Sequence, residues 1–460
     1  MDATTDAIAG FVDSLDLKAL TDSALHEAKR RLIDTLGCAL GGLDSPPAQI
    51  ARSLAADTRG TNKSATAIGL DDPTSVELAA FANTVMVRYL DYNDMHFTAT
   101  GGGGHPSDLL PTALAVGEAT GASGLETLLA AVIAYEVNGA IAGGVWLRRR
   151  GWDQGLHVVI ASAMAAGKLL GLSREQLGHA VSLAATPNVP VRQTRVGELS
   201  MWKGCATAGA ARNGVFAALL AQKGMTGPPE PFEGRDGIWE QVTGPFEITI
   251  PTQADRFVIE NVATKTHPAE YNAQGPLDLI ADLRDQIEVG EIDQIDVETY
   301  FLAYDEIGSE AQKWDPQTRE TADHSLPYLL AVALVDGDIS AASFTRDRIL
   351  DPELRPLMQR IRIQENPDFT ARFPAEINCR ISIRHNSGEM VSGHLLHPRG
   401  HPLNQVTDAE LNDKFDSLAH AYRHSSETAV CDELRDSIWD LDRIDDIKSL
   451  MEPLRQLSTS

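Results

Sequence analysis

The sequence has few cysteines and no closely spaced pair of them. Its 460 residues include four cysteines, Cys38, Cys205, Cys379 and Cys431, and there is no CxxC motif. Iron–sulfur clusters usually draw on several, often closely spaced cysteines, and a disulfide framework needs a regular set of them, so neither is expected here. We therefore predict reduced thiols and a cytoplasmic protein.

Positive charge is also scarce. Lysine and arginine number 39 against 65 aspartates and glutamates, which gives a formal net charge of −26. A protein without a basic surplus cannot displace counterions from phosphates, so a nucleic-acid partner and an anionic membrane surface are both disfavoured. Surface charge is screened over about 8 Å in physiological salt. A small anionic substrate therefore remains compatible with a pocket that holds cations of its own.

Long uncharged hydrophobic runs are missing as well. No stretch reaches the roughly 18 uncharged apolar residues of a membrane span. The N-terminal segment MDATTDAIAGFVDSL carries acids instead of a basic segment followed by an apolar run, so no signal peptide is expected. The chain is 43% hydrophobic and 23% charged, which is ordinary for a folded globular protein. Its length predicts two or three domains.

Residues 21–224 have the pattern of one helix after another. Apolar residues recur at helical spacing from Leu25 to Leu40, where Gly41-Gly42 predicts a stop. Several later segments are rich in alanine and glycine, which lets helices approach one another closely. The other helices that we expect cover residues 75–90, 124–145, 161–170 and 207–222, and Pro228-Pro229 follows the last of them.

The pattern changes near residue 260 to a mixture of strands and helices. We expect strands over residues 294–301, 361–364, 377–383 and 390–396, with a hairpin turn at 386–388, and helices over 275–283 and 326–335. Helix returns after Asn404, with Thr407 as the N-cap. The predicted fold is mainly α with an α+β part. Its domains are an all-helical domain (1–262), an α+β lid (263–403) and C-terminal helices that rejoin the helical domain (404–460).

The densest polar cluster runs from Tyr89 to Asp108, at the junction of two helices. It holds Asp91, Asp94, His96, Gly101 to Gly104, His105 and Ser107. A glycine-rich backbone next to a helix N-terminus can bind an anion, and carboxylates beside imidazoles are the material of general acid–base catalysis. The alternative is a plain loop whose acids cap helices. A metal site from Asp91, Asp94, His96 and His105 is a further alternative, although the spacing matches no tight helix-based metal motif.

Other candidates are scattered along the chain. Lys203 opens a helix, where the helix dipole disfavours a cation, so a carboxylate partner is one explanation and a solvated surface lysine is the other. The same two explanations, a carboxylate partner or a solvated surface side chain, apply to Arg195. Cys205 has no histidine near it in sequence, so a nucleophilic role is disfavoured. Lys265 and His267 stand at the predicted domain boundary and could reach into an interdomain cleft. His157 and Tyr304 have packing as their ordinary explanation.

Five short motifs in order make the chain resemble the MmgE/PrpD family, which includes 2-methylcitrate dehydratase, cis-aconitate decarboxylase and iminodisuccinate epimerase. The similarity runs over nearly the whole chain and keeps family-like intervals. The motifs are Leu90-Asp91-Tyr92-Asn93-Asp94, Gly104-His105-Pro106-Ser107-Asp108, Gly155-Leu156-His157, Met201-Trp202-Lys203-Gly204, and Lys265 with Pro268-Ala269-Glu270-Tyr271.

The resemblance implies a large helical domain made from both chain ends, a smaller α+β lid, and a homodimer. It implies an active site between the two domains without a metal or an organic cofactor. The decarboxylase carries a threonine where this chain has Met95 and a histidine where it has Glu270, so the dehydratase is the closer match. The pocket residues implied by position are Asp91, His105, His157, Lys203, Lys265 and Tyr304.

The implied activity is that of a cofactor-independent lyase on a small polycarboxylate, with elimination of water after α-proton abstraction. His105 would move the proton at carbon with Asp91 orienting it, and His157 or Tyr304 would protonate the leaving group. Decarboxylation, epimerisation, metal-dependent hydrolysis and catalytically silent polycarboxylate binding remain alternatives. The residues expected to bind the substrate are Lys203, Lys265, Arg195, Asp94 and Ser107.

Overall fold

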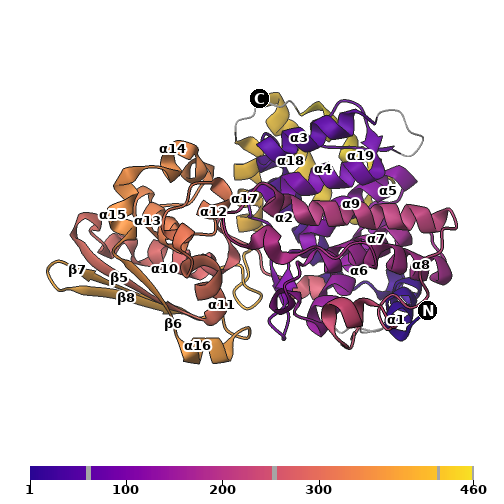
Figure 1. The fold of residues 1–460 in the computed structure, drawn as a ribbon. Coiled ribbons are helices and arrows are strands. Elements are labelled where there is room, and N and C mark those ends of the chain that lie inside the picture. Colours follow the sequence, from indigo (N-terminus) through magenta and orange to yellow (C-terminus); the bar gives the residue numbers. More distant parts are fainter. Residues whose placement is uncertain (59–63, 251–255, 422–424, 458–460) are drawn as a thin grey trace.

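The chain forms two lobes that stand side by side (Figure 1). The computed structural model describes residues 1–58, 64–250, 256–421 and 425–457. One lobe, the helical body, holds the helices of the N-terminal part together with those after residue 407. The other lobe, the lid, contains a four-stranded sheet and its helices between residues 269 and 395. The predicted fold class, mainly α with an α+β part, is confirmed.

The helical body packs Ala-rich and Gly-rich helices at short distances. A Cβ on Gly214 would lie 2.4 Å from the carbonyl oxygen of Val159, so this close approach of two helices requires glycine. The five helices predicted with bounds, now α2, α4, α6, α7 and α9, are present, and α2, α7 and α9 are longer than predicted. The helices of the body are α1 Ala3–Ser14, α2 Asp22–Gly41, α3 Pro46–Ala56, α4 Val76–Tyr89, α5 Leu110–Thr120, α6 Gly124–Gly144, α7 Gly155–Leu169, α8 Arg174–Ala185, α9 Trp202–Gln222, α17 Asp408–His420, α18 Ser425–Trp439 and α19 Lys448–Met451.

Helix α6 runs through the middle of the body. Among the described residues it is the helix long and apolar enough to cross a membrane, judged by length and composition. Within its most apolar window, 83% of the residues are buried by neighbouring helices. A central helix of a packed helical core has this composition, because every face of it is covered.

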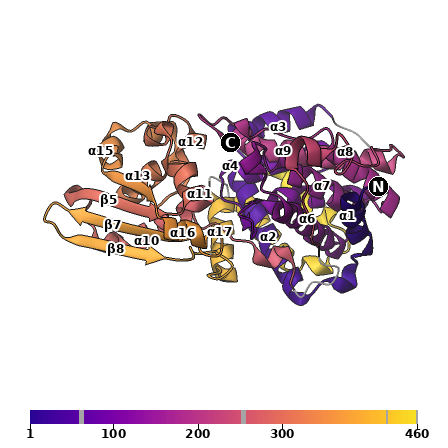
Figure 2. The same ribbon diagram turned by 60° about the horizontal axis from the view of Figure 1, so that its bottom comes forward.

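The C-terminal helices pack onto the N-terminal part of the chain (Figure 2). Thr407 is the N-cap of α17, as predicted, and it forms a capping box with Glu410. Phe415 of α17 lies against Gly37 of α2, where an added Cβ would be 3.2 Å from the Phe415 Cα. One hydrophobic core therefore combines side chains from residues 8–262 with side chains from residues 411–457, and a second core contains side chains from residues 269–383.

The lid is built on a mixed sheet with strand order β6-β5-β7-β8. Strand β5 pairs in parallel with β6 and antiparallel with β7, and a turn with Gly388 at φ 87° joins β7 to β8. Apolar side chains of the sheet pack on α10 and α13 in the second core. The elements are β5 Ile292–Thr299, β6 Ile361–Glu365, β7 Cys379–His385, β8 Met390–Leu395, α10 Gln274–Leu283, α11 Phe301–Ala303, α12 Arg319–Ala322, α13 Leu326–Asp336, α14 Arg346–Ile349, α15 Arg355–Met358 and α16 Pro367–Arg372.

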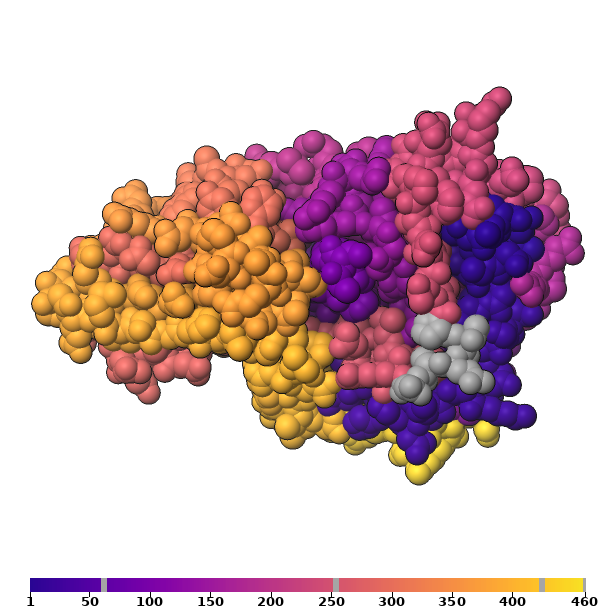
Figure 3. Space-filling view, turned by 90° about the horizontal axis from the view of Figure 1, so that it is seen from below, coloured from indigo at the N-terminus to yellow at the C-terminus, as the bar shows by residue number. Residues whose placement is uncertain are grey.

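The glycine-rich junction after α4 is more ordered than a plain loop. Strands β3 (His96–Phe97) and β4 (Gly103–Gly104) form a short antiparallel pair, in addition to the pair β1 (Ser64–Ala65) and β2 (Thr74–Ser75). A Cβ on Gly103 would lie 2.0 Å from the carbonyl oxygen of His96, so glycine is required there. This small hairpin delivers His105 to the start of the 3₁₀ turn Pro106–Leu109. The body and lid meet along a continuous seam (Figure 3).

Candidate active site

A cavity of about 110 Å³ lies between the body and the lid. Its size suits a compact molecule and not an extended coenzyme. One part of its wall is cationic and acidic, and another part is apolar, with Met95, Phe97, Trp146 and Leu302 among the apolar residues. The polar residues that line it are Arg88, Asp91, His105, Arg148, Asp153, Gln154, His157, Arg192, Arg195, Lys265, Glu270, Glu306 and His324.

Asp91 is the charged centre of this site. It follows Leu90, the C-cap of α4, and has a left-handed backbone with φ 49°. Lys265 donates to its Oδ1 at 2.6 Å, and Lys203 donates to its Oδ2 at 2.9 Å. Burial would raise the pKa of Asp91, but Lys203, Lys265 and Arg88 together hold that pKa well below its usual range. The carboxylate is therefore ionised and fully paired.

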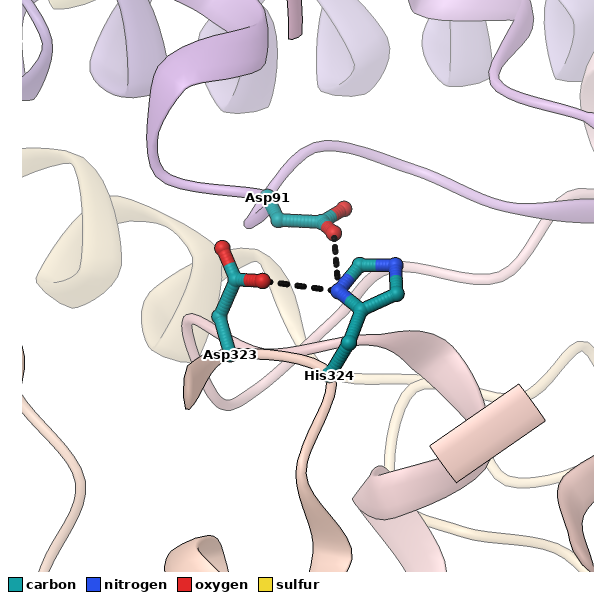
Figure 4. Close-up of side chains that lie close together, drawn as sticks. All are labelled: Asp91, Asp323 and His324. Carbon is teal, nitrogen blue, oxygen red and sulfur yellow. Dashed lines mark hydrogen bonds and ion pairs between the residues drawn. The ribbon is translucent and has the colours of Figure 1, made fainter. Parts of the chain in front are cut away.

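Asp323 and His324 approach Asp91 from the lid (Figure 4). They follow the short helix α12 and precede α13. Asp323 accepts from Lys203 at 3.0 Å and from Nδ1 of His324 at 2.7 Å, and that Nδ1 lies 3.7 Å from Oδ2 of Asp91. The ammonium of Lys203 thus bridges a carboxylate of the body and a carboxylate of the lid.

His105 presents one unprotonated nitrogen to the cavity. Its Nδ1 lies 2.6 Å from the carbonyl oxygen of Asp94. Because a carbonyl oxygen only accepts, Nδ1 carries the proton and Nε2 is left with a lone pair. Burial, with Arg88 and Lys265 adding to it, lowers the pKa of His105 well below 6.5. A neutral imidazole with a fixed tautomer is suited to accept a proton from carbon.

A buried hydrogen-bond network holds the His105 segment in place. Asp94 accepts from the Ser107 hydroxyl at 2.6 Å and from the Tyr135 hydroxyl at 2.7 Å. Asn93 donates to the Ser107 oxygen at 2.8 Å and accepts from Arg88 at 2.7 Å. Arg88 lines the cavity, and the other side chains of this network lie behind its wall. The predicted substrate ligands Asp94 and Ser107 do not line the cavity and instead fix the backbone that carries His105.

Arg195 and His157 have polar atoms in the cavity wall that no partner satisfies within the described part of the chain. Arg195 uses Nε to bind Asp153 at 2.6 Å, while its buried Nη2 has no acceptor. Both ring nitrogens of His157 are buried without a partner, and burial lowers the pKa of its imidazole to about 4. Because an unsatisfied buried polar group is costly, these atoms are best explained by a ligand that supplies acceptors for the N–H groups and a donor for the second ring nitrogen of His157.

Ion pairs between body and lid border the cavity. Glu306 of the lid pairs with Arg148 and, at 3.1 Å, with Arg192 of the body, and Asp305 pairs with Arg148 at 2.6 Å. Burial would raise the pKa of Glu306, but the two arginines hold it at about 2. Burial and the Glu306 charge raise the pKa of Glu270, also in the wall, to about 8. Glu270 is therefore largely protonated at neutral pH.

The structure gathers most of the predicted site residues but separates others. Asp91, His105, His157, Arg195 and Lys265 line one cavity. Lys203 lies against this group without lining the cavity, because its ammonium is bound to Asp91 and Asp323. Tyr304 is half-buried in the lid and does not line the cavity.

Sequence reasoning missed several residues of the wall. Arg88 lies inside a helix pattern, and Glu306 and His324 lie in the lid, outside the polar cluster of residues 89–108. The adjacent Asp323-His324 pair before an apolar helix was the one local signal available. Cys205 is buried outside the cavity, and burial raises the pKa of its thiol to about 11. A thiolate nucleophile is thus disfavoured there.

The four residues of the metal alternative do not form one cluster. Asp94 is bound to hydroxyl groups, and His96 lies outside the cavity wall. Asp91, Asp323 and His324 do come together, but two ammonium groups already neutralise these carboxylates. A divalent cation there would have to displace Lys203 or Lys265. The donor set therefore fits an internal ion-pair network better than it fits a metal.

Comparison with known proteins gives consistent matches. The family models of the MmgE/PrpD N-terminal domain and the MmgE/PrpD C-terminal domain match residues 6–251 and 267–440. The 2-methylcitrate dehydratase of Escherichia coli (strain K12) is 29% identical over 373 residues, 74% of each chain. That of Cupriavidus necator is 30% identical over 397 residues, 80% of this chain and 78% of its own. The cis-aconitate decarboxylase of Mus musculus is 26% identical over 438 residues, 90% of this chain and 86% of its own.

Proposed function

The chain belongs to the MmgE/PrpD family, and from this premise we propose that it is a cofactor-independent lyase that eliminates water from a small hydroxy-polycarboxylate of the 2-methylcitrate kind. The resemblance read from the sequence is confirmed, and the named relatives are a dehydratase and a decarboxylase. One observation carries the proposal. The cavity combines a neutral imidazole, His105, with the unpartnered guanidinium nitrogen of Arg195 and the unpartnered ring of His157.

The cationic part of the wall is suited to bind carboxylates. Arg195 offers a free N–H, and Arg88 and Lys265 add positive charge on the same side. Hydrogen bonds between ionised partners are about twice as strong as neutral ones, and a dry site strengthens them further. The apolar wall around Met95 and Phe97 can receive a part of the substrate without charge, such as a methyl group.

His105 is placed to remove a proton from the carbon next to a carboxylate. Its Nε2 is the free nitrogen, and its tautomer is fixed by the Asp94 carbonyl. The negative charge that develops on the adjacent carboxylate in the transition state is stabilised by Lys265 and Arg195, and such stabilisation is usually the largest catalytic contribution. Lys203 takes a different role from the predicted one. It bridges Asp91 to Asp323 and so holds the lid against the body.

Decarboxylation and epimerisation use a similar pocket and are the competing activities. An epimerase would abstract the same proton without expelling a group, and a decarboxylase would release carbon dioxide. The identities to the dehydratases, 29% and 30%, are slightly above the 26% to the decarboxylase, which favours dehydration. A catalytically silent protein would bind polycarboxylates without a change in ultraviolet absorbance. Homodimer formation and a cytoplasmic location are further parts of this proposal.

The experiment is a panel of acids followed by proton NMR in deuterated water, with and without a chelator. We expect 2-methylcitrate to lose water and to form a double bond conjugated with a carboxylate, equally in both conditions. The His105→Gln variant should lose turnover. Full activity of that variant, loss of activity in chelator, or exchange of the α-proton without elimination would each contradict the proposal.

A further inference from the structure

We propose that His324 is the general acid that delivers a proton to the departing hydroxide, and that Asp323 is its positioning residue. This inference rests on the proposed dehydration. His324 belongs to the lid, whereas the proposed base, His105, belongs to the body, and both line the same cavity. A reaction that removes a proton and a hydroxide from neighbouring carbons needs a proton acceptor and a proton donor, and these two imidazoles face one space.

The orientation of His324 leaves one nitrogen for the substrate. Its Nδ1 is engaged by Asp323 at 2.7 Å and lies near Asp91. The other ring nitrogen, Nε2, points away from both carboxylates (Figure 4). Within the described residues no hydrogen bond to this Nε2 is present. A carboxylate that accepts from Nδ1–H fixes the direction of the ring, and once the imidazole is protonated its Nε2–H is presented to a substrate oxygen.

The surroundings of the two imidazoles differ in a way that separates their roles. His105 faces the cations Arg88 and Lys265, and these two charges disfavour a positive imidazole. Its Nδ1 donates to a neutral carbonyl group and not to a carboxylate. His324 is held by the Asp323 carboxylate, with Asp91 close by, which stabilises a positive imidazole. Burial lowers the pKa of both rings, so the difference between them lies in their neighbours, which are cations at His105 and carboxylates at His324.

The charged groups around His324 also explain when it takes up its proton. Burial and the neighbouring Lys203 lower the pKa of His324 to about 4, against the pull of Asp323 and Asp91. Glu306 faces it as well. A bound polycarboxylate would bring further negative charge into the cavity and so favour the protonated ring. Binding of the substrate would thus protonate the general acid.

His157 is the weaker candidate for this step. Neither of its ring nitrogens has a partner among the described residues, so no carboxylate is in contact to stabilise a positive ring. Burial lowers the pKa of its imidazole to about 4, against the opposing charge of Asp153. His157 is suited to a hydrogen bond with the bound substrate instead of proton delivery.

The step balances without a further reactant. The carbon–hydrogen bond breaks and its proton goes to Nε2 of His105, while its electron pair forms the double bond. The carbon–oxygen bond breaks with its electron pair on oxygen, and Nε2–H of His324 supplies the proton that makes this oxygen water. His105 ends positive and His324 ends neutral, and exchange with solvent after product release restores both.

The experiment compares two leaving groups in the intact enzyme. The probes are 2-methylcitrate and its analogue in which fluorine replaces the departing hydroxyl group, because fluoride leaves without a proton. His324→Gln should lower kcat for 2-methylcitrate by about 10²–10⁴-fold, the range of a lost general acid, and should affect the fluoro analogue by less than about tenfold. Asp323→Asn should show the same selectivity with a smaller loss.

Two matched variants complete the design. His105→Gln should lose both reactions, because both need proton removal from carbon, and His157→Gln should weaken both by one common factor. Turnover of the fluoro analogue by His324→Gln also shows that this variant folds. The inference is overturned if His324→Gln loses both substrates equally or neither. If the wild-type enzyme turns over neither probe, the proposed function itself has failed, which is a different result.

Discussion

The ammonium of Lys265 donates to Oδ1 of Asp91 at 2.6 Å and to the carbonyl oxygen of the same residue at 2.7 Å. One buried lysine at the junction of body and lid thus fixes both the side chain and the backbone at the end of α4. A left-handed backbone is strained for most residue types. At Asp91 the two hydrogen bonds from Lys265 hold the chain in this conformation. The geometry of the cavity floor depends on this pair.

Replacing Asp91 by asparagine should destabilise the enzyme and inactivate it. Asparagine adopts the left-handed backbone, so the change removes charge with little change of shape. Lys265 would lose its only ionised contact within the described residues. Breaking a buried ion pair from one side costs about 3–5 kcal/mol, which urea denaturation would measure. Asp293→Asn, at a half-exposed pair with Arg384, is the matched control and should shift stability by less than about 0.5 kcal/mol.

Arg195 should matter for substrate affinity. The Arg195→Lys variant keeps a positive charge near the buried Asp153 but cannot also offer the second nitrogen to a ligand. Loss of one charge-assisted hydrogen bond of about 1.5–3 kcal/mol corresponds to a rise in KM of about 10–100-fold. Steady-state kinetics would check this, with Arg235→Lys on the exposed surface as control. An unchanged KM would remove Arg195 from the binding site.

Local patterns of the sequence were sufficient for most of the fold. Helical periodicity and stop signals located five of the helices of the body, and Thr407 was predicted as an N-cap because acids follow it in the first turn. Alternation and the turn at Gly388 located the β7–β8 hairpin. The small β3–β4 pair was not predicted, because two-residue strands have no periodicity to detect. These features are local, so nearby residues determine them.

The site was predicted less completely because its contacts are long-range. Lys203 was expected to meet a carboxylate and does, but the carboxylates are those of Asp91 and Asp323, which are 112 and 120 residues away. His324 comes from the lid, and its neighbour Asp323 was the one local signal that could have singled it out. Tyr304 was carried over by alignment alone and does not line the cavity. Proximity across a domain boundary is a property of the tertiary fold, which spacing along the chain does not encode.

The stability of the enzyme should fall as pH decreases below 6.5, in part because of His96. Burial lowers the pKa of His96 to about 4. Below pH 6.5 the unfolded imidazole therefore takes up a proton that the folded one does not, and the folded state loses stability until the pH reaches about 4. At pH 5 this group alone contributes a loss of about 2 kcal/mol.

The measurement is the free energy of unfolding between pH 7.5 and pH 5, for wild type and for His96→Gln. Other buried histidines, among them His157 and His324, titrate in the same direction and are present in both proteins. The difference between the two curves therefore isolates His96. Parallel curves would contradict the prediction, since the variant should lose less stability than wild type as the solution is acidified.

Gly400 should tolerate no side chain, and its substitution should disturb the site through Lys265. Its φ is 85°, and an added Cβ would lie 1.8 Å from the carbonyl oxygen of Thr264, whose N–H binds the Gly400 carbonyl at 2.9 Å. Gly400→Ala must then combine a left-handed backbone penalty with a displacement of the segment that carries Lys265. We expect a loss of about 3 kcal/mol and a reduced kcat.

Gly388 provides the matched control for this glycine. Its φ is 87°, nearly the same, but no atom lies within 4 Å of an added Cβ at the β7–β8 turn. Gly388→Ala should therefore show the backbone penalty alone, about 1–2 kcal/mol, with activity unchanged. Denaturation of both variants, with kinetics on the folded proteins, separates the two contributions. Equal losses of stability with equal activities would mean that the contact between Gly400 and Thr264 does not position Lys265.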